Sequence, residues 1–181
     1  MICSGLTMME VSMKASNIKI TCEYLPHPMG VERTPRISWQ YEGPQQTAYR
    51  IVIGRSRGLT DLVYDSGAVN GDENLLIPCE FPLESMTRYY YRVFLQTGQE
   101  WSESEVSWFE TGLLQPSDFN AKWITASGCE SPLFQKSFRL DKIGDARLYI
   151  CGLGFYEATL NGKRIGDHQM DPVWSDYQKR N

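Results

Sequence analysis

The sequence predicts an all-β protein. From residue 18 onward, short runs of β-branched and aromatic residues are separated by Pro, Gly, Asp and Asn about every 8 to 12 positions, a spacing typical of β-sandwiches. No segment has a helical period of useful length. With 181 residues, 41% of them hydrophobic, the chain is long enough for one large or two small domains with packed cores.

The first two strands are expected over residues 18–24 and 36–41. In the second of these, Ile37, Trp39 and Tyr41 share one face, because side chains alternate along a strand. Either that face or the opposite one covers the core. We interpret Trp39 as the core tryptophan of a sandwich.

Four further strands follow. One is expected over residues 48–54, and two shorter edge strands over residues 62–64 and 75–77. A last strand is expected between Trp101 and Thr111. Glycine and proline residues close most of these runs, as they do at turns between strands.

The strongest strand pattern covers residues 83–95, in which the odd positions form a continuous apolar row. Leu83, Thr87 and Tyr89 at its start have the spacing of the tyrosine corner, in which a buried tyrosine sends its hydroxyl to nearby backbone. We therefore predict a fibronectin type III-like (immunoglobulin-like) domain over residues 18–112, with Tyr89 in a structural role.

The sequence pattern divides the chain into four parts. We expect residues 1–17 to form a flexible leader and residues 113–118, with Pro, Ser and Asp, to form a linker after the domain of residues 18–112. Residues 119–181 are interpreted as the truncated start of a second β-sandwich. Its strands are expected over residues 122–125, 132–140, 146–151, 155–160 and 163–165.

The last two of these strands flank Asn161 and Gly162, the preferred pair for a type I′ hairpin turn. An incomplete sandwich leaves strand edges and an apolar face uncovered. We therefore expect residues 119–181 to be less ordered than residues 18–112, or to self-associate.

Several phrases, taken in order, resemble the amino-terminal part of bacterial α-L-rhamnosidases. In the first domain they are residues 35–39 (PRISW), 46–51 (QTAYRI), 64–67 (YDSG), 87–93 (TRYYYRV) and 108–113 (WFETGL). In the second they are residues 121–124 (AKWI), 131–133 (SPL), 146–149 (ARLY), 152–157 (GLGFYE), 160–166 (LNGKRIG) and 171–177 (DPVWSDY).

The resemblance implies a multidomain glycoside hydrolase: a fibronectin-like module, a β-sandwich of the galactose-binding or jelly-roll type, and a catalytic barrel of paired helices. Inverting hydrolysis, the route understood for this family, needs an acid and a base carboxyl about 6.5–9.5 Å apart. In the family that pair lies in the barrel. No catalytic residue is therefore assigned in this chain.

The carboxylates that are present are interpreted as solvated surface charge. The neighbouring pairs are Asp171 with Asp176, Glu103 with Glu105, and Asp141 with Asp145. His27 and His168 have no Ser or Cys arrangement around them that suggests a catalytic triad, so we interpret both as surface histidines.

Sugar binding needs an aromatic face for the ring C–H groups beside planar polar groups for the hydroxyls. The candidates are Trp174, Tyr177 and Tyr156, with Asn161 or Asp176. Packing against neighbouring domains explains these side chains better, so the carbohydrate-binding residues stay unknown.

The composition of the chain disfavours several classes of binding partner. A net charge of −4 disfavours nucleic acid and anionic membranes, and no apolar run reaches membrane-spanning length. Without a recognisable signal peptide, the chain is expected in the cytoplasm. The five cysteines are scattered and show no metal-ligand spacing, so we expect reduced thiols, no metal and no cofactor.

The first hypothesis is thus a non-catalytic amino-terminal fragment of an α-L-rhamnosidase. Its partners would be the downstream catalytic domain and rhamnosides. A stand-alone interaction module, presenting loops or an edge strand to a protein, is the alternative, because this fold hosts many functions. A carbohydrate-binding fragment is a third possibility.

Overall fold

The structure is a computed structural model that describes residues 14–142, 144, 146–167 and 169–172. The chain forms two compact units, residues 1–124 and residues 125–181, and each is described by itself. Strands and one short 3-10 turn are the regular elements of the described residues, which confirms the all-β prediction.

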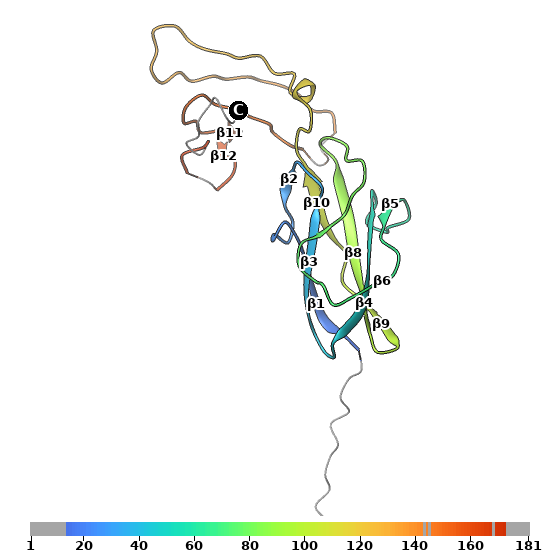
Figure 1. Ribbon diagram of the computed structural model, residues 1–181. Coiled ribbons are helices and arrows are strands. Elements are labelled where there is room, and N and C mark those ends of the chain that lie inside the picture. Colours follow the sequence, from blue (N-terminus) through green and yellow to red (C-terminus); the bar gives the residue numbers. More distant parts are fainter. Residues whose placement is uncertain (1–13, 143, 145, 168, 173–181) are drawn as a thin grey trace, which may run out of the picture. The chain divides into compact units, whose positions relative to one another are not determined.

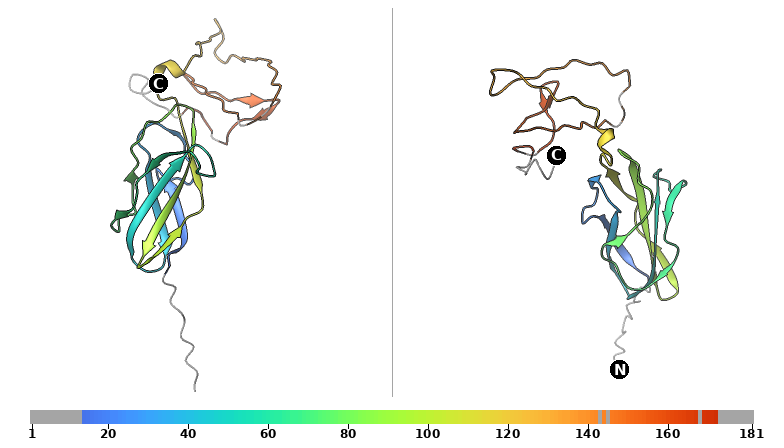
Figure 2. Two further views of the ribbon diagram at one scale, coloured as in Figure 1. Left: turned by 90° about the vertical axis from the view of Figure 1, so that its right-hand side faces the viewer. Right: turned by 45° about the horizontal axis from the view of Figure 1, so that its top comes forward.

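The first unit is a sandwich of two sheets packed face to face (Figure 1). The smaller sheet has the strand order β1 (Ser16–Cys22), β3 (Arg36–Glu42), β7 (Ile77–Pro78). The larger has the order β2 (Met29–Val31), β10 (Ser107–Thr111), β8 (Arg88–Thr97), β4 (Gln46–Gly54), β5 (Leu62–Asp65), with β6 (Val69–Asn70) beside β4 and β9 (Glu100–Glu103) beside β8. Figure 2 shows the same two layers from two further directions.

The core lies between the sheets. The odd positions of β8, from Tyr89 to Leu95, are fully buried, as their alternation predicts. On the smaller sheet, Ile37 and Trp39 cover this row, so it is their face of β3 that meets the core. The buried indole N–H of Trp39 donates to the side-chain oxygen of Gln46 at 2.8 Å, which satisfies the one polar atom of that ring.

The tyrosine corner is confirmed. The hydroxyl of Tyr89 accepts a hydrogen bond from the backbone N–H of Glu84 at 3.0 Å. The Tyr89 ring packs edge-on against Phe81 at 5.3 Å and stacks on Phe109 at 5.4 Å. Tyr89 therefore joins the chain entering β8 to the centre of the core.

Three predicted strand ends need correction, and a residue at positive φ lies close to each. The strand expected over residues 18–24 ends at Cys22 because Glu23 and Tyr24 have φ values of 49° and 66°. Leu76 and Met86, at 53° and 52°, likewise delay β7 to Ile77 and β8 to Arg88. A residue at positive φ leaves the extended conformation. Positive φ at a residue other than glycine cannot be predicted from the side chain.

Other corrections concern short elements. β2 and β6 are absent from the sequence prediction, since two or three residues are too few to show a period. The single strand expected between Trp101 and Thr111 is two strands, β9 and β10. β9 folds back on β8 as a hairpin, with Gly98 in the turn at φ 63°.

After β10 the chain forms a 3-10 turn, η1 (Pro116–Asp118). Leu114 donates its backbone N–H to the hydroxyl of Ser85 at 3.1 Å, and that hydroxyl also donates to the Asp118 carboxylate. The segment interpreted as a linker is thus hydrogen-bonded to the end of the sandwich.

The second unit contains a single short hairpin among its described residues, β11 (Thr159–Leu160) with β12 (Lys163–Arg164). Asn161 and Gly162 have φ values of 51° and 75°, so the predicted type I′ turn is confirmed.

The other strands expected after residue 119 are wrong as strand assignments. Residues 122–125, 132–140 and 146–151 form no ladder, and the strand expected over residues 155–160 shrinks to Thr159–Leu160. A strand is defined by hydrogen bonds to a neighbouring strand. No strand lies beside the first three segments in the described part of the chain, and in the fourth Tyr156 forms an isolated bridge with Asp171 ahead of β11.

Candidate functional site

Most residues proposed for sugar contact from the sequence lie outside the described part of the chain: Trp174, Asp176 and Tyr177. Of the two that are described, Asn161 is exposed in the hairpin turn. Tyr156 donates its backbone N–H to the Asp171 carbonyl at 2.8 Å, and burial raises the pKa of its hydroxyl. Among the described residues, no hydrogen bond or ring contact joins Tyr156 to Asn161.

The carboxylates and histidines lie as follows. Glu103 forms an ion pair with Arg92 at 2.7 Å, and Glu105 and Asp141 are exposed. Asp145 and His168 lie outside the described residues. His27 is exposed, and its ring stacks on Trp108 at 4.9 Å.

Several described carboxyl groups have a shifted pKa, and each shift is downward. Arg36 lowers the pKa of Glu23, Arg50 lowers that of Asp65, and hydroxyl donors lower those of Asp61 and Asp118. A general acid in glycoside hydrolysis needs the opposite shift, so that it still holds a proton near neutral pH. These four groups are therefore unsuited to that role.

The outer face of the seven-stranded sheet gathers aromatic and arginine side chains. Arg50 of β4 lies opposite Phe94 of β8, and Gln96 of β8 lies opposite Trp101 of β9. The guanidinium carbon of Arg50 is 5.8 Å from the centre of the Phe94 ring. This stretch of sheet, which we call the Arg50–Trp101 face, lies where β4, β6, β8 and β9 meet (Figure 1).

Arg50 is held in place by Asp65 of β5. Its Nε and Nη2 atoms donate to the two carboxylate oxygens at 2.8 and 2.6 Å, and the Gly67 backbone N–H donates to the same carboxylate at 2.9 Å. A bidentate pair fixes the plane of the guanidinium as well as its position.

A shallow cavity of about 360 Å³ opens over this face, lined by Arg50, Gly67, Ala68, Phe94 and Trp101. A second hollow, of about 290 Å³, shares Arg50 and Phe94 and adds Arg57 and Arg92. The sequence pattern does not predict this face, because the outward, even positions of residues 83–95 mix polar and aromatic side chains. Phe94 among those positions was the available signal.

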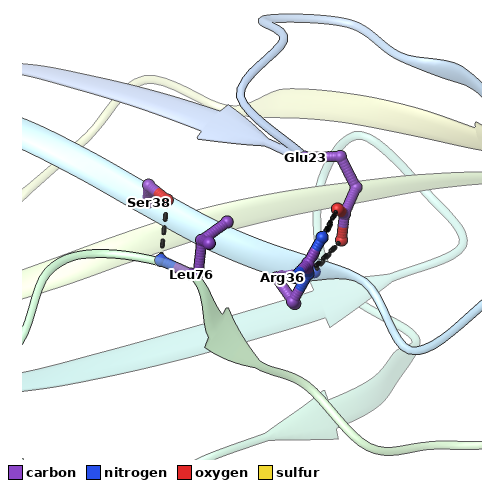
Figure 3. A network of polar contacts seen from close by, with 4 residues as sticks. All are labelled: Glu23, Arg36, Ser38 and Leu76. Carbon is purple, nitrogen blue, oxygen red and sulfur yellow. Dashed lines mark hydrogen bonds and ion pairs between the residues drawn. The ribbon is translucent and has the colours of Figure 1, made fainter.

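A second candidate surface lies at the turn after β1. Cys22 and Leu25 exchange backbone hydrogen bonds at 2.9 Å around Glu23 and Tyr24. Figure 3 shows Arg36 of β3 reaching the Glu23 carboxylate with two of its nitrogens, while the Leu76 N–H donates to Ser38 nearby at 2.8 Å. The ion pair holds a turn of two non-glycine residues at positive φ.

This turn borders a groove of about 620 Å³ along residues 23–36. Three large apolar side chains are exposed around it: Tyr24, Leu25 and Met29, each more than half accessible. Such a cluster at the surface of a small domain is typical of a protein contact.

The described cysteines of the two units differ in solvent exposure. Cys22 and Cys79 are buried in the first unit, and burial raises the pKa of each thiol to about 12. Cys129 and Cys151 in the second unit are free and exposed. Within the described ranges, no three ligand-type side chains cluster as a metal site would need, and no helix could cross a bilayer.

Comparison with known proteins gives the family. Residues 18–115 match the family model described as the Rha78A-like, N-terminal immunoglobulin domain, which covers more than half of the chain. The chain belongs to the α-L-rhamnosidase family. Residues 141–181 match a second model from the family, the α-L-rhamnosidase N-terminal domain.

Curated α-L-rhamnosidases align along much of the chain. One from Formosa agariphila is 31% identical over 201 residues, which is 90% of this chain and 21% of the relative. One from Streptomyces avermitilis is 40% identical over 116 residues, 58% of this chain and 11% of the relative. The chain thus spans about a fifth of the length of the first relative and less of the second.

Solved α-L-rhamnosidases share the fold. The Streptomyces avermitilis enzyme, crystallised with L-rhamnose, superposes with a TM-score of 0.53 at 36% identity, over 60% of this chain and 12% of that one. The Dictyoglumus thermophilum enzyme gives 0.55 at 30% identity, over 60% and 14%. The predicted resemblance to α-L-rhamnosidases and the immunoglobulin-like fold are both confirmed.

Proposed function

We propose that this chain is a non-catalytic amino-terminal part of an α-L-rhamnosidase. Its role would be to support a catalytic domain that removes terminal α-L-rhamnose from glycosides. The observation that carries the proposal is that the chain matches two amino-terminal domains of the family in order, over residues 18–115 and 141–181.

The chemistry of the described carboxyl groups supports the non-catalytic part of this proposal. An inverting pair needs one carboxyl that stays protonated and one that is ionised, both facing a sugar pocket. The two cavities over the Arg50–Trp101 face are lined by no carboxylate among the described residues. The groove beside the β1 turn is lined by two carboxylates: Glu23, which is ionised by its pairing with Arg36, and Glu32, which is exposed to solvent.

The test is an assay of the purified 181-residue chain with an aryl α-L-rhamnoside. We expect no release of the aryl alcohol, with the Streptomyces avermitilis enzyme as the positive control. Turnover that co-purifies with the chain and saturates with substrate would overturn the proposal.

The second candidate is a stand-alone protein-interaction module, and the exposed cluster of Tyr24, Leu25 and Met29 favours it. This candidate requires a chain that is monomeric and unfolds cooperatively by itself. Sedimentation velocity and urea unfolding measure both properties. A chain that is aggregated at all concentrations would count against it.

A further inference from the structure

We propose that the Arg50–Trp101 face binds a 6-deoxypyranose, with L-rhamnose as its ligand. The place of the site rests on the geometry of the first domain. The choice of sugar rests on the proposed function. The site would let the amino-terminal domain hold a rhamnoside without cleaving it.

The platform for the sugar ring is aromatic. Trp101 is 41% exposed although it lies in a strand, and with Phe94 it lines one cavity beside the small residues Gly67 and Ala68. Aromatic faces attract the C–H side of a pyranose ring, and the low bulk of Gly67 and Ala68 leaves room for it. A volume of about 360 Å³ is ample for one or two sugar rings.

The polar contact comes from Arg50. A guanidinium has five N–H donors, and Asp65 takes two of them, which leaves three for a ligand. Because Asp65 and the Phe94 ring both fix the guanidinium, those donors are oriented before a sugar arrives. Neighbouring hydroxyls on a pyranose match such a fork of parallel donors.

The rest of the lining favours a deoxysugar. Apart from Arg50, the cavity is bordered by Gly67, Ala68, Phe94 and Trp101, which offer no polar side chain except the indole N–H. A methyl group at C5 contacts such a lining without loss. A hydroxymethyl group there would gain no hydrogen bond from the lining, and its hydroxyl would replace an apolar contact with a polar group.

The experiment is an NMR titration of the full ¹⁵N-labelled chain with methyl α-L-rhamnopyranoside. We expect millimolar binding, with the largest shifts at the Trp101 indole N–H and the Arg50 Nη N–H groups. Methyl α-L-mannopyranoside, which differs only by the added 6-hydroxyl, should bind several-fold more weakly.

Two variants and one matched control locate the site. Trp101→Ala should weaken binding about tenfold through loss of the stacking surface. Arg50→Lys keeps the charge but not the planar fork, and should weaken binding several-fold. Trp123→Ala removes a tryptophan that is 64% exposed elsewhere in the first unit, and should leave binding unchanged. Circular dichroism checks that each variant is folded.

Four results would overturn the site: no shifts with the rhamnoside, shifts confined to other residues, unchanged binding by folded Trp101→Ala, or tighter binding of the mannoside. Trp101 shifts that follow protein dilution rather than sugar would make this face a contact between copies of the chain, and would also overturn it. Turnover of an aryl rhamnoside is measured separately. Turnover would overturn the proposed non-catalytic function, but it would not change the conclusion about sugar binding at the Arg50–Trp101 face.

Discussion

Residues 88–97 and residues 132–140 both carry several large apolar side chains, yet only the first segment forms a strand. In the first segment Tyr89, Tyr91, Val93 and Leu95 are fully buried in β8, between β4 and β10. In the second, Leu133, Phe134 and Phe138 are 92%, 50% and 61% exposed, and no strand lies beside the segment among the described residues. The difference shows that an apolar run becomes a strand when a neighbour supplies its backbone partners, whatever its intrinsic preference.

Hydrogen exchange should show the largest contrast. Amides in the centre of β8 open only with the whole domain, so they should exchange about 10⁴-fold or more slowly than amides of residues 132–140. Mass spectrometry of peptides from the exchanged chain measures both. Equal protection of the two segments in a strictly monomeric sample would contradict the comparison.

Thiol labelling should divide the cysteines in the same way. Cys22 and Cys79 are buried with a thiol pKa of about 12, so at neutral pH they lack the reactive thiolate. Cys129 and Cys151 are exposed. Brief alkylation at pH 8 followed by peptide mapping should modify the second pair and spare the first until urea is added; early modification of Cys22 would argue against the packed sandwich.

Replacing one phenylalanine in each region by alanine should show the same contrast in the free energy of unfolding. Phe109→Ala should lower the free energy of unfolding of the first domain by about 3–5 kcal/mol, because the ring is fully buried against Tyr89 and Tyr91. Phe138→Ala is the matched control and should change that free energy by less than about 0.5 kcal/mol. Urea denaturation followed by tryptophan fluorescence measures both, and similar losses in the two variants would refute the assignment.

The Tyr89 hydroxyl should contribute less to the free energy of unfolding than a buried aromatic ring of the core does. Tyr89→Phe keeps the packing and removes the hydroxyl that accepts from the Glu84 N–H. We expect a loss of about 1 kcal/mol in the free energy of unfolding. A neutral result would mean that water replaces the hydroxyl at Glu84.

The smallest effect is expected at the turn after β1, and it depends on pH. Arg36 holds the pKa of Glu23 below its usual 4.5, so this contribution to stability is present above pH 4.5 and is lost as the pH falls through the lowered value. The difference in unfolding free energy between the native chain and Glu23→Gln should therefore be larger at pH 7 than at pH 3. A difference that grows on acidification would show that the ion pair is absent in solution.

Much of the first domain follows from local pattern. Three features could be predicted: the buried odd row of β8, the core position of Trp39 and the tyrosine corner. The first two follow from the two-residue alternation of a strand, and the third from the spacing of Leu83, Thr87 and Tyr89. The Asn161-Gly162 turn could be predicted for a similar reason, since its conformation depends on those two residues.

The Arg50–Trp101 face could not be predicted. Its residues come from β4, β8 and β9 and from the turn after β5, and only the register of those strands brings them together. The positive φ values could not be predicted either. They occur at Glu23, Tyr24, Leu76 and Met86, and side chains of these types impose no such conformation by themselves.

Four features of this protein therefore follow from its sequence alone: the fold class, the buried row of the longest strand, the hairpin turn and the resemblance to α-L-rhamnosidases. Each of these depends on residues close together in the chain or on phrases read in order. Three others required the folded chain: where strands end, which expected strands exist and which outward side chains share a surface. Those outcomes depend on backbone hydrogen bonds and register between segments far apart in sequence, which no local pattern contains.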